Sequence, residues 1–225
     1  MNYPEILLKP TKEKSIERKH PWVFSGALKY IPESIQEGDV VDVVNKTGRH
    51  ICTGHYQIGS ITVRVLSFGK ESIDQEFFNT KIKNAYHVRE NLNLTDSPET
   101  NIYRLVHAEG DNLPGLVIDV YNNSVVVQCH SIGMHKSINM IAEAVKKCFG
   151  DKLISIYSKC VETLPKEYAT SVQNEYLYQS EGFKEETVIG LEYGNKFEID
   201  WVNGQKTGFF IDQRENRKLL AEFSK

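Results

Sequence analysis

The sequence predicts an α+β protein with a small β-barrel at its N-terminus and a larger layer of strands and helices after it. β-branched residues recur in short runs before residue 70, the apolar spacing becomes helical near Glu71, and further short strands flank one amphipathic helix. With 225 residues and 40% hydrophobic content, the chain has room for two cores, since domains hold roughly 100 to 150 residues. We place them at residues 1–70 and 71–201, followed by a linker and helix at 202–225.

The N-terminal barrel is predicted from four short strands, at residues 5–8, 39–44, 50–57 and 61–68. The turns Asn45-Lys46-Thr47-Gly48 and Gly59-Ser60 separate the last three runs. Closing such strands into a barrel removes their exposed edges. The segment 17–28 breaks the pattern with Pro21 and Gly26, and we expect it to pack Trp22 and Phe24 against the barrel.

The central domain is predicted to begin with a helix, because Phe78, Ile82, Ala85 and Tyr86 recur at helical steps. Strands are expected at 102–107, 116–121 and 125–130, with a tight turn at Asn122-Asn123. A second helix over 136–149 has a single apolar face and ends at Gly150. Strands at 153–157, 186–192 and 196–201 complete a strand-strand-helix-strand-strand layer, and the polar stretch 160–182 is expected to be a surface loop.

The last segment, residues 202–225, is predicted to be a loop containing Gly204 and Gly208, followed by a helix that carries Leu219, Leu220 and Phe223. The Asp212-x-x-Glu215 signature can cap that helix. Since such a helix normally leads into another element, we expect a further domain to follow.

Charge is distributed unevenly along the chain. The net charge is -3, but residues 1–70 hold ten Lys or Arg against seven Asp or Glu, and the remainder holds 17 against 23. A basic first module suits a localised phosphate-contacting surface. No apolar run approaches the ~18 residues of a membrane span, and the N-terminus lacks a secretory signal, so we expect a cytoplasmic protein.

The cysteines are interpreted as reduced core thiols. Cys52, Cys129, Cys148 and Cys160 are widely spaced, without a CxxC pair or a zinc-finger histidine. The sequence therefore predicts no metal site.

The strings GQKTGFFIDQRENR (204–217) and LPGLVIDVY (113–121) carry a family resemblance. Together with Trp22-Val23-Phe24-Ser25-Gly26 and Glu37-Gly38-Asp39, they resemble the bacterial and archaeal large-subunit ribosomal RNA methyltransferases that begin with a PUA domain. The resemblance runs along the whole chain and is weakest between residues 160 and 187. Asn112 stands where the family often has Gly, and Asn tolerates the positive φ of that turn.

The resemblance implies an RNA-binding PUA barrel, a central α+β domain and a C-terminal Rossmann-like domain that binds S-adenosylmethionine (SAM). It also implies methylation of cytosine C5 in large-subunit rRNA, which needs a thiolate that adds to C6. The family's SAM loop and nucleophilic cysteine would lie beyond Lys225. We therefore expect no catalytic residue in this chain and expect the chain alone to be inactive.

The resemblance makes the loop 206–214 a candidate wall of the cofactor pocket. The candidate cofactor-binding residues are Lys206, Thr207, Phe209, Phe210, Asp212 and Arg214. The alternative is a structural connector with a capped helix. In a third interpretation Lys206, Arg214 and Arg217 face RNA phosphates.

Basic residues around an aromatic pair form the candidate RNA surface, because such mixtures suit single-stranded or loop RNA. The candidates are Lys12, Lys14, Arg18, Lys19, His20, Arg49 and Arg64, and His50 lies on the same strands. The alternative is a solvated charged face. His107, Glu109 and Asp111 alternate before Pro114-Gly115 and are interpreted as turn chemistry rather than a metal cluster.

Three hypotheses follow. The first is the recognition half of a SAM-dependent rRNA methyltransferase, with ribosomal RNA as partner and no membrane. The second is a freestanding RNA-binding or assembly module. The third is a homodimer formed through apolar surface near Phe209, Phe210 and Phe223.

Overall fold

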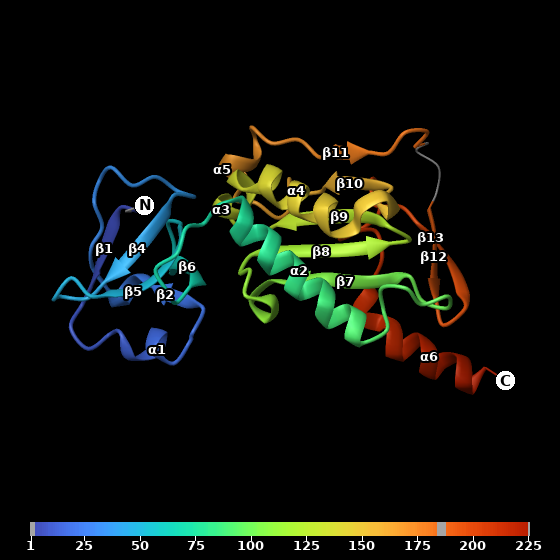
Figure 1. The fold of residues 1–225 in the computed structure, drawn as a ribbon, viewed down its shortest axis with the longest axis horizontal. Helices are drawn as coiled ribbons and strands as arrows, with labels where there is room; N and C mark the ends of the chain where they lie inside the picture. The colour runs from blue at the N-terminus through green and yellow to red at the C-terminus, as the bar shows by residue number, and fades with distance from the viewer. Residues whose placement is uncertain (1–2, 184–187, 225) are drawn as a thin grey trace.

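The computed structural model describes residues 3–183 and 188–224. Figure 1 shows a small N-terminal module of curled strands beside a larger module in which helices cover one face of a sheet. The α+β class and the order of the two modules are as predicted.

The N-terminal module is a six-stranded sheet in the order β2-β6-β5-β4-β1-β3. Its strands are β1 (Glu5–Leu8), β2 (Trp22–Phe24), β3 (Leu28–Tyr30), β4 (Val40–Val44), β5 (His50–Tyr56) and β6 (Ile61–Ser67), and the short helix α1 (Lys14–Glu17) follows β1. Alternate apolar residues such as Ile6, Val41 and Val63 point into one core. The four predicted strands are confirmed to within one residue at each end.

The segment 17–28 differs from its prediction, because it contains β2 and the start of β3. Val23, rather than its aromatic neighbours, enters the core. Trp22 and Phe24 lie on the outer face of β2 with His20, and Phe24 is 45% exposed. Alternation along a strand places both aromatic rings opposite to Val23.

The central module is a five-stranded sheet in the order β11-β10-β9-β8-β7. Its strands are β7 (Ile102–His107), β8 (Leu116–Tyr121), β9 (Ser124–Cys129), β10 (Ser155–Ser158) and β11 (Glu175–Gln179). The helices α2 (Gln75–Asn91) and α4 (Ile138–Phe149) lie across one face (Figure 1). Asp74 caps α2 by accepting from the backbone N–H groups of Glu76 and Phe77, and Gly150 ends α4 with a positive φ. A short helix α3 (Ile132–Lys136) precedes α4.

The predicted loop 160–182 was wrong in part, since it holds the helix α5 (Lys166–Ala169) and the edge strand β11. Every residue of β11 is exposed or half-buried, so no apolar alternation marks it. The predicted strands near 186–192 and 196–201 are β12 (Val188–Glu192) and β13 (Asn195–Ile199), and they form a separate two-stranded sheet instead of completing the layer. Glu186 and Thr187 lie outside the described residues.

The C-terminal segment covers the face of the central sheet that the helices leave free. Ile102, Tyr121, Val126 and Tyr157 on that face pack against Ile199 and Trp201. The helix α6 (Arg214–Phe223) then extends away from the sheet (Figure 1). The residue before it is Gln213, and no side chain caps its first turn, so the predicted Asp212 cap is absent.

Candidate functional site

The loop 204–210 is fixed to the central sheet by Thr207. Its hydroxyl is buried, donates to Oδ2 of Asp119 at 2.6 Å and lies 2.8 Å from the hydroxyl of Tyr121. Arg104 closes the network, since its Nε and Nη2 atoms donate to the two carboxylate oxygens of Asp119 at 2.8 and 3.0 Å. Hydrogen bonding to Asp119 raises the pKa of Arg104. Thr207, predicted to line a ligand pocket, therefore serves as the anchor of the loop.

The two phenylalanines of the loop point in different directions. Phe209 packs on Phe197 at 5.0 Å between ring centroids, and the guanidinium of Arg217 lies 4.3 Å from the Phe209 ring. Phe210 is 45% exposed. Of the pair, Phe210 is the one whose ring is available to a ligand.

Arg214 and Arg217 bind the buried carboxylate of Glu192. Arg217 donates from Nε and Nη2 at 2.7 and 2.9 Å, and Arg214 donates from Nε at 3.2 Å and also to the carbonyl of Ile102. Burial tends to raise the pKa of Glu192, but the hydrogen bonds from the two arginines outweigh it and lower that pKa. The contacts tie α6 to the β12–β13 hairpin, whereas Lys206 and Asp212 in the same segment are exposed.

The barrel meets the central module through a row of residues on the outer faces of β2, β6 and β5. Trp22 pairs with Arg64, and Arg64 pairs with His55, across these strands. Nε1 of Trp22 donates to Glu109 at 2.8 Å. The ring of His55 is buried against Gly133 of α3, where a Cβ would come within 2.2 Å of Cγ.

The other predicted RNA-binding residues lie on or near α1 and are exposed. Arg49 forms an ion pair with Glu17 at 2.6 Å, and the ammonium of Lys19 lies 4.6 Å from the ring of Phe68. His20 stacks edge-on with Trp22 and tilts toward Phe24, at centroid distances of 5.9 and 5.8 Å. Lys12, Lys14 and Arg18 are exposed in the same segment. Arg64 is apart from this group, because it faces the central module.

The turn before Pro114-Gly115 is as predicted. Residues 108–111 form a 3₁₀ turn, and Asn112 has a φ of 56°. Asp111 accepts from Arg89 in a bidentate pair, and Glu109 accepts from Trp22. Within residues 3–183 and 188–224, no group of His, Cys, Asp and Glu could hold a metal ion.

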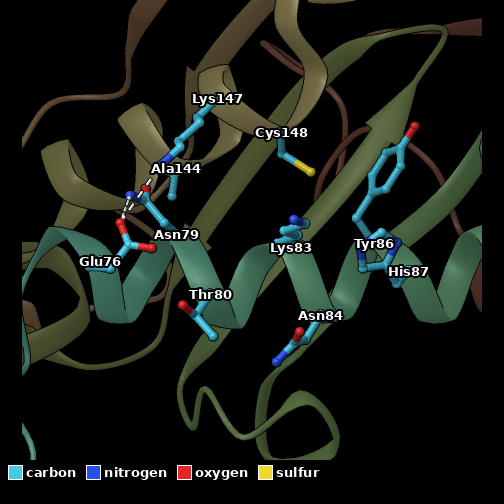
Figure 2. Close-up of a pocket in the computed structure, with 10 residues that line it drawn as sticks. All are labelled: Glu76, Asn79, Thr80, Lys83, Asn84, Tyr86, His87, Ala144, Lys147 and Cys148. Carbon is cyan, nitrogen blue, oxygen red and sulfur yellow. Dashed lines mark hydrogen bonds and ion pairs between the residues drawn. The ribbon is translucent and has the colours of Figure 1, made fainter.

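A hollow of about 610 Å³ lies between α2 and α4 (Figure 2). These helices cover one face of the sheet, and the segment that contains the loop 204–210 packs on the other face. Lys83 and Cys148 line the hollow. Burial raises the pKa of Cys148 to about 11, so its sulfur is a protonated thiol at neutral pH. The hollow therefore offers no activated nucleophile.

The sequence interpretation missed the polar face of the central sheet. Arg104, Asp119 and Gln128 share that face, while Leu105, Ile118 and Val127 of the same strands enter the core under the helices. The signal was present as polar residues at alternate positions of apolar strands. By the same alternation, His130, which follows β9 directly, lies at the end of this face.

No helix in the described part of the chain is long and apolar enough to cross a membrane.

Curated relatives match the chain along almost its entire length. Ribosomal RNA large subunit methyltransferase I of Alteromonas mediterranea is 34% identical over 223 residues, covering 98% of this chain and 54% of that protein. The protein of the same name from Vibrio campbellii is 34% identical over 221 residues, with the same two coverages. The chain therefore spans about half the length of the curated relatives it matches.

Two solved structures share the fold. A candidate SAM-dependent methyltransferase from Streptococcus mutans aligns with a TM-score of 0.78 at 22% identity, over 96% of this chain and 54% of that one. A candidate methyltransferase in complex with SAH aligns with a TM-score of 0.77 at 21% identity, over 98% of this chain and 53% of that one. Residues 6–68 match the PUA-like domain family. The N-terminal barrel is therefore a PUA-like domain, joined to a central module that has the fold of these structures.

Proposed function

We propose that this chain is the RNA-recognition portion of a SAM-dependent methyltransferase that acts on large-subunit ribosomal RNA, with C5 of a cytosine as the target. The PUA-like barrel and the names of the curated relatives support the RNA substrate. The observation that carries the proposal is the loop 204–210, which a buried network of hydrogen bonds attaches to the central sheet. A pre-organised loop of this kind suits a binding wall.

In this proposal Phe210 and Asp212 form one side of the cofactor pocket. Phe210 presents an exposed ring for the adenine, and the exposed carboxylate of Asp212 suits a cationic or hydroxyl-bearing group. When bound, SAM supplies a methyl group on a sulfonium. Thr207, Phe209 and Arg214 contribute by holding this wall in place.

Methylation at C5 also needs a cysteine thiolate that can reach the base. Cys52 and Cys148 have pKa values raised by burial to about 12 and about 11. A hydrogen bond with Cys129 lowers the pKa of Cys160 to about 7, but both of these side chains are fully buried. We therefore assign recognition to this chain and the methyl transfer to the part of the relatives that it does not span.

The second hypothesis is a freestanding RNA-binding module. A pure binding protein has no need for the anchored loop 204–210, which favours the methyltransferase. The homodimer hypothesis depends on apolar surface near Phe209, Phe210 and Phe223. Phe210 and Phe223 are 45% and 81% exposed, whereas Phe209 packs on Phe197. Sedimentation of a strict monomer at all concentrations would remove this hypothesis.

The first test is a parallel titration of this chain with SAM and with a ribosomal RNA fragment, at two salt concentrations. We expect RNA binding that weakens with salt and no SAM binding, because phosphate contacts release counterions. A DNA strand of the same length and sequence controls for charge alone. If this chain binds SAM, the assignment of RNA recognition alone to it is contradicted. If it binds neither SAM nor RNA, the proposed function is overturned.

A further inference from the structure

Arg64 lies at the boundary between the barrel and the central module. Its strand neighbours Val63 and Val65 point into the barrel core, so its own side chain points outward. The Cδ atom of Arg64 lies 3.7 Å from the place that a Cβ on Gly115 would take. Within residues 3–183 and 188–224, its guanidinium makes no hydrogen bond or ion pair, although the residue is half-buried. A partly desolvated guanidinium without an acceptor indicates a place for an anion.

Backbone contacts place two further residues with polar side chains, His130 and Lys206, on the same side of the central sheet as Arg64. The backbone N–H of His130 donates to the carbonyl of Gly115 at 2.8 Å, which places His130 next to the turn that Arg64 contacts. Gln128, two residues earlier and on the same face, donates to the carbonyl of Lys206 at 3.3 Å. Both His130 and Lys206 are exposed, and their side chains make no hydrogen bond or ion pair with any described residue.

The charges around His130 are predominantly positive. Partial desolvation of the imidazole by its surroundings lowers the pKa of His130, and so do the charges of Arg104, Lys206 and Arg64, while Glu109 acts in the opposite direction. Arg104 is already neutralised by Asp119, and Glu109 accepts from Trp22. The indole of Trp22 is uncharged, so Glu109 keeps its negative charge and favours the charged form of Arg64. Arg64 and Lys206 together still exceed Glu109 by one positive charge. This excess of positive charge favours the binding of an anion there.

Aromatic side chains adjoin this charge on the barrel side. Trp22 is the cross-strand neighbour of Arg64, and its ring contacts those of His20 and Phe24. Cations beside aromatic rings suit single-stranded RNA, whose phosphates need charge and whose unpaired bases stack. A peptide carboxylate would use the charges but not the row of rings.

We infer that Arg64, His130 and Lys206 form one phosphate-binding patch for the RNA backbone, shared between the barrel and the central sheet. This inference rests on the proposed function and assigns Lys206 to RNA rather than to the cofactor. The guanidinium of Arg64 donates two parallel hydrogen bonds to one phosphate, and the ammonium of Lys206 adds a second positive charge. RNA bound here bridges the two modules and leads from the barrel toward the anchored loop.

The test is the affinity of a fluorescent ribosomal RNA fragment for the 225-residue chain and its variants, measured by anisotropy over a range of salt concentrations. The variants are Arg64→Gln, Lys206→Asn and their combination, and Asn suits the positive φ of residue 206. Lys83→Gln is the matched control, because Lys83 is exposed and lies on the helix side of the sheet (Figure 2). Each patch variant should bind on the order of fivefold more weakly and lose about 0.7 from the slope of log affinity against log salt.

Arg64→Lys separates the effect of charge from that of geometry, because lysine keeps the positive charge but lacks the planar guanidinium. Its affinity for RNA should lie between that of the wild type and that of Arg64→Gln. The inference is overturned if folded Arg64→Gln and Lys206→Asn variants keep the affinity and salt slope of Lys83→Gln. In that case the proposed function stands, provided that the wild type binds RNA. If the wild type binds no RNA at all, the proposed function and this inference both fail.

Discussion

Asp119 links two parts of the chain that lie 88 residues apart. Its carboxylate is fully buried and accepts from Arg104 and Thr207 at once. Three donated hydrogen bonds to one buried charge make this the residue on which the position of the loop 204–210 depends. The alternation along the strand indicates that Asp119 shares a face with Tyr121, but it does not reveal that Thr207 is its partner, because that contact is distant in sequence.

We expect Asp119→Asn to destabilise the chain by about 3 kcal/mol, because Arg104 is left partly buried without its counter-charge. The free energy of unfolding from urea titration is the measurement. Asp212→Asn, at an exposed carboxylate of the same segment, is the control and should change it by less than about 0.5 kcal/mol. Equal stability of the two variants would show that the loop is held by other contacts.

At the scale of elements, the strands and helices with a strong period were predictable and the short or edge elements were not. β7 and β8 match their predicted bounds, because apolar residues run through both of them. The three-residue strands β2 and β3 are too short to show a period, and both faces of β11 are partly exposed. That β12 and β13 form their own sheet depends on contacts distant in sequence, which local pattern does not encode.

The same distinction holds for the candidate site. The sequence indicated the loop 206–214, but not which of its residues face inward. Thr207 is buried by partners in β8, and Arg214 by Glu192 and the carbonyl of Ile102. Arg64 was a candidate from the sequence, whereas His130 became one only when the fold placed it beside Gly115.

The attachment of α6 depends on Glu192 at the end of β12. We expect Glu192→Gln to leave Arg214 and Arg217 without a counter-charge and to loosen α6 from the hairpin. Hydrogen exchange of the α6 backbone amides should become faster, on the order of tenfold, for a loss of about 1.4 kcal/mol in local stability. Glu222→Gln, at an exposed position of α6 itself, should leave the exchange rates unchanged.

At the scale of the whole molecule, the interface between the barrel and the central module contains a titratable group, His55. His55 is buried against Gly133 of α3, and its Nδ1 atom has no hydrogen-bond partner among the residues that the structure describes. Burial, followed by the charges of Arg64 and Lys136, lowers its pKa from 6.5 to about 4. Nζ of Lys136 lies 3.4 Å from Oδ1 of Asp39 in the barrel, so an ion pair lies at this interface beside the neutral imidazole.

This burial makes the interface sensitive to acid. Between the unfolded pKa near 6.5 and the folded pKa of about 4, the unfolded chain binds the proton more readily, so stability falls as pH falls through that window. His55 alone should contribute a slope of up to about 1.4 kcal/mol per pH unit, and above pH ~6.5 it should contribute none. Urea unfolding at several pH values measures this slope for the wild type and for His55→Gln, which keeps a polar side chain but does not titrate. The difference in stability between the two proteins should grow smaller as the pH is lowered from about 6.5 to about 4. His87→Gln, at an exposed histidine on α2, is the control for the loss of a histidine in general. A difference in stability that stays constant between pH 6.5 and about 4 would mean that the burial of His55 does not make folding depend on pH.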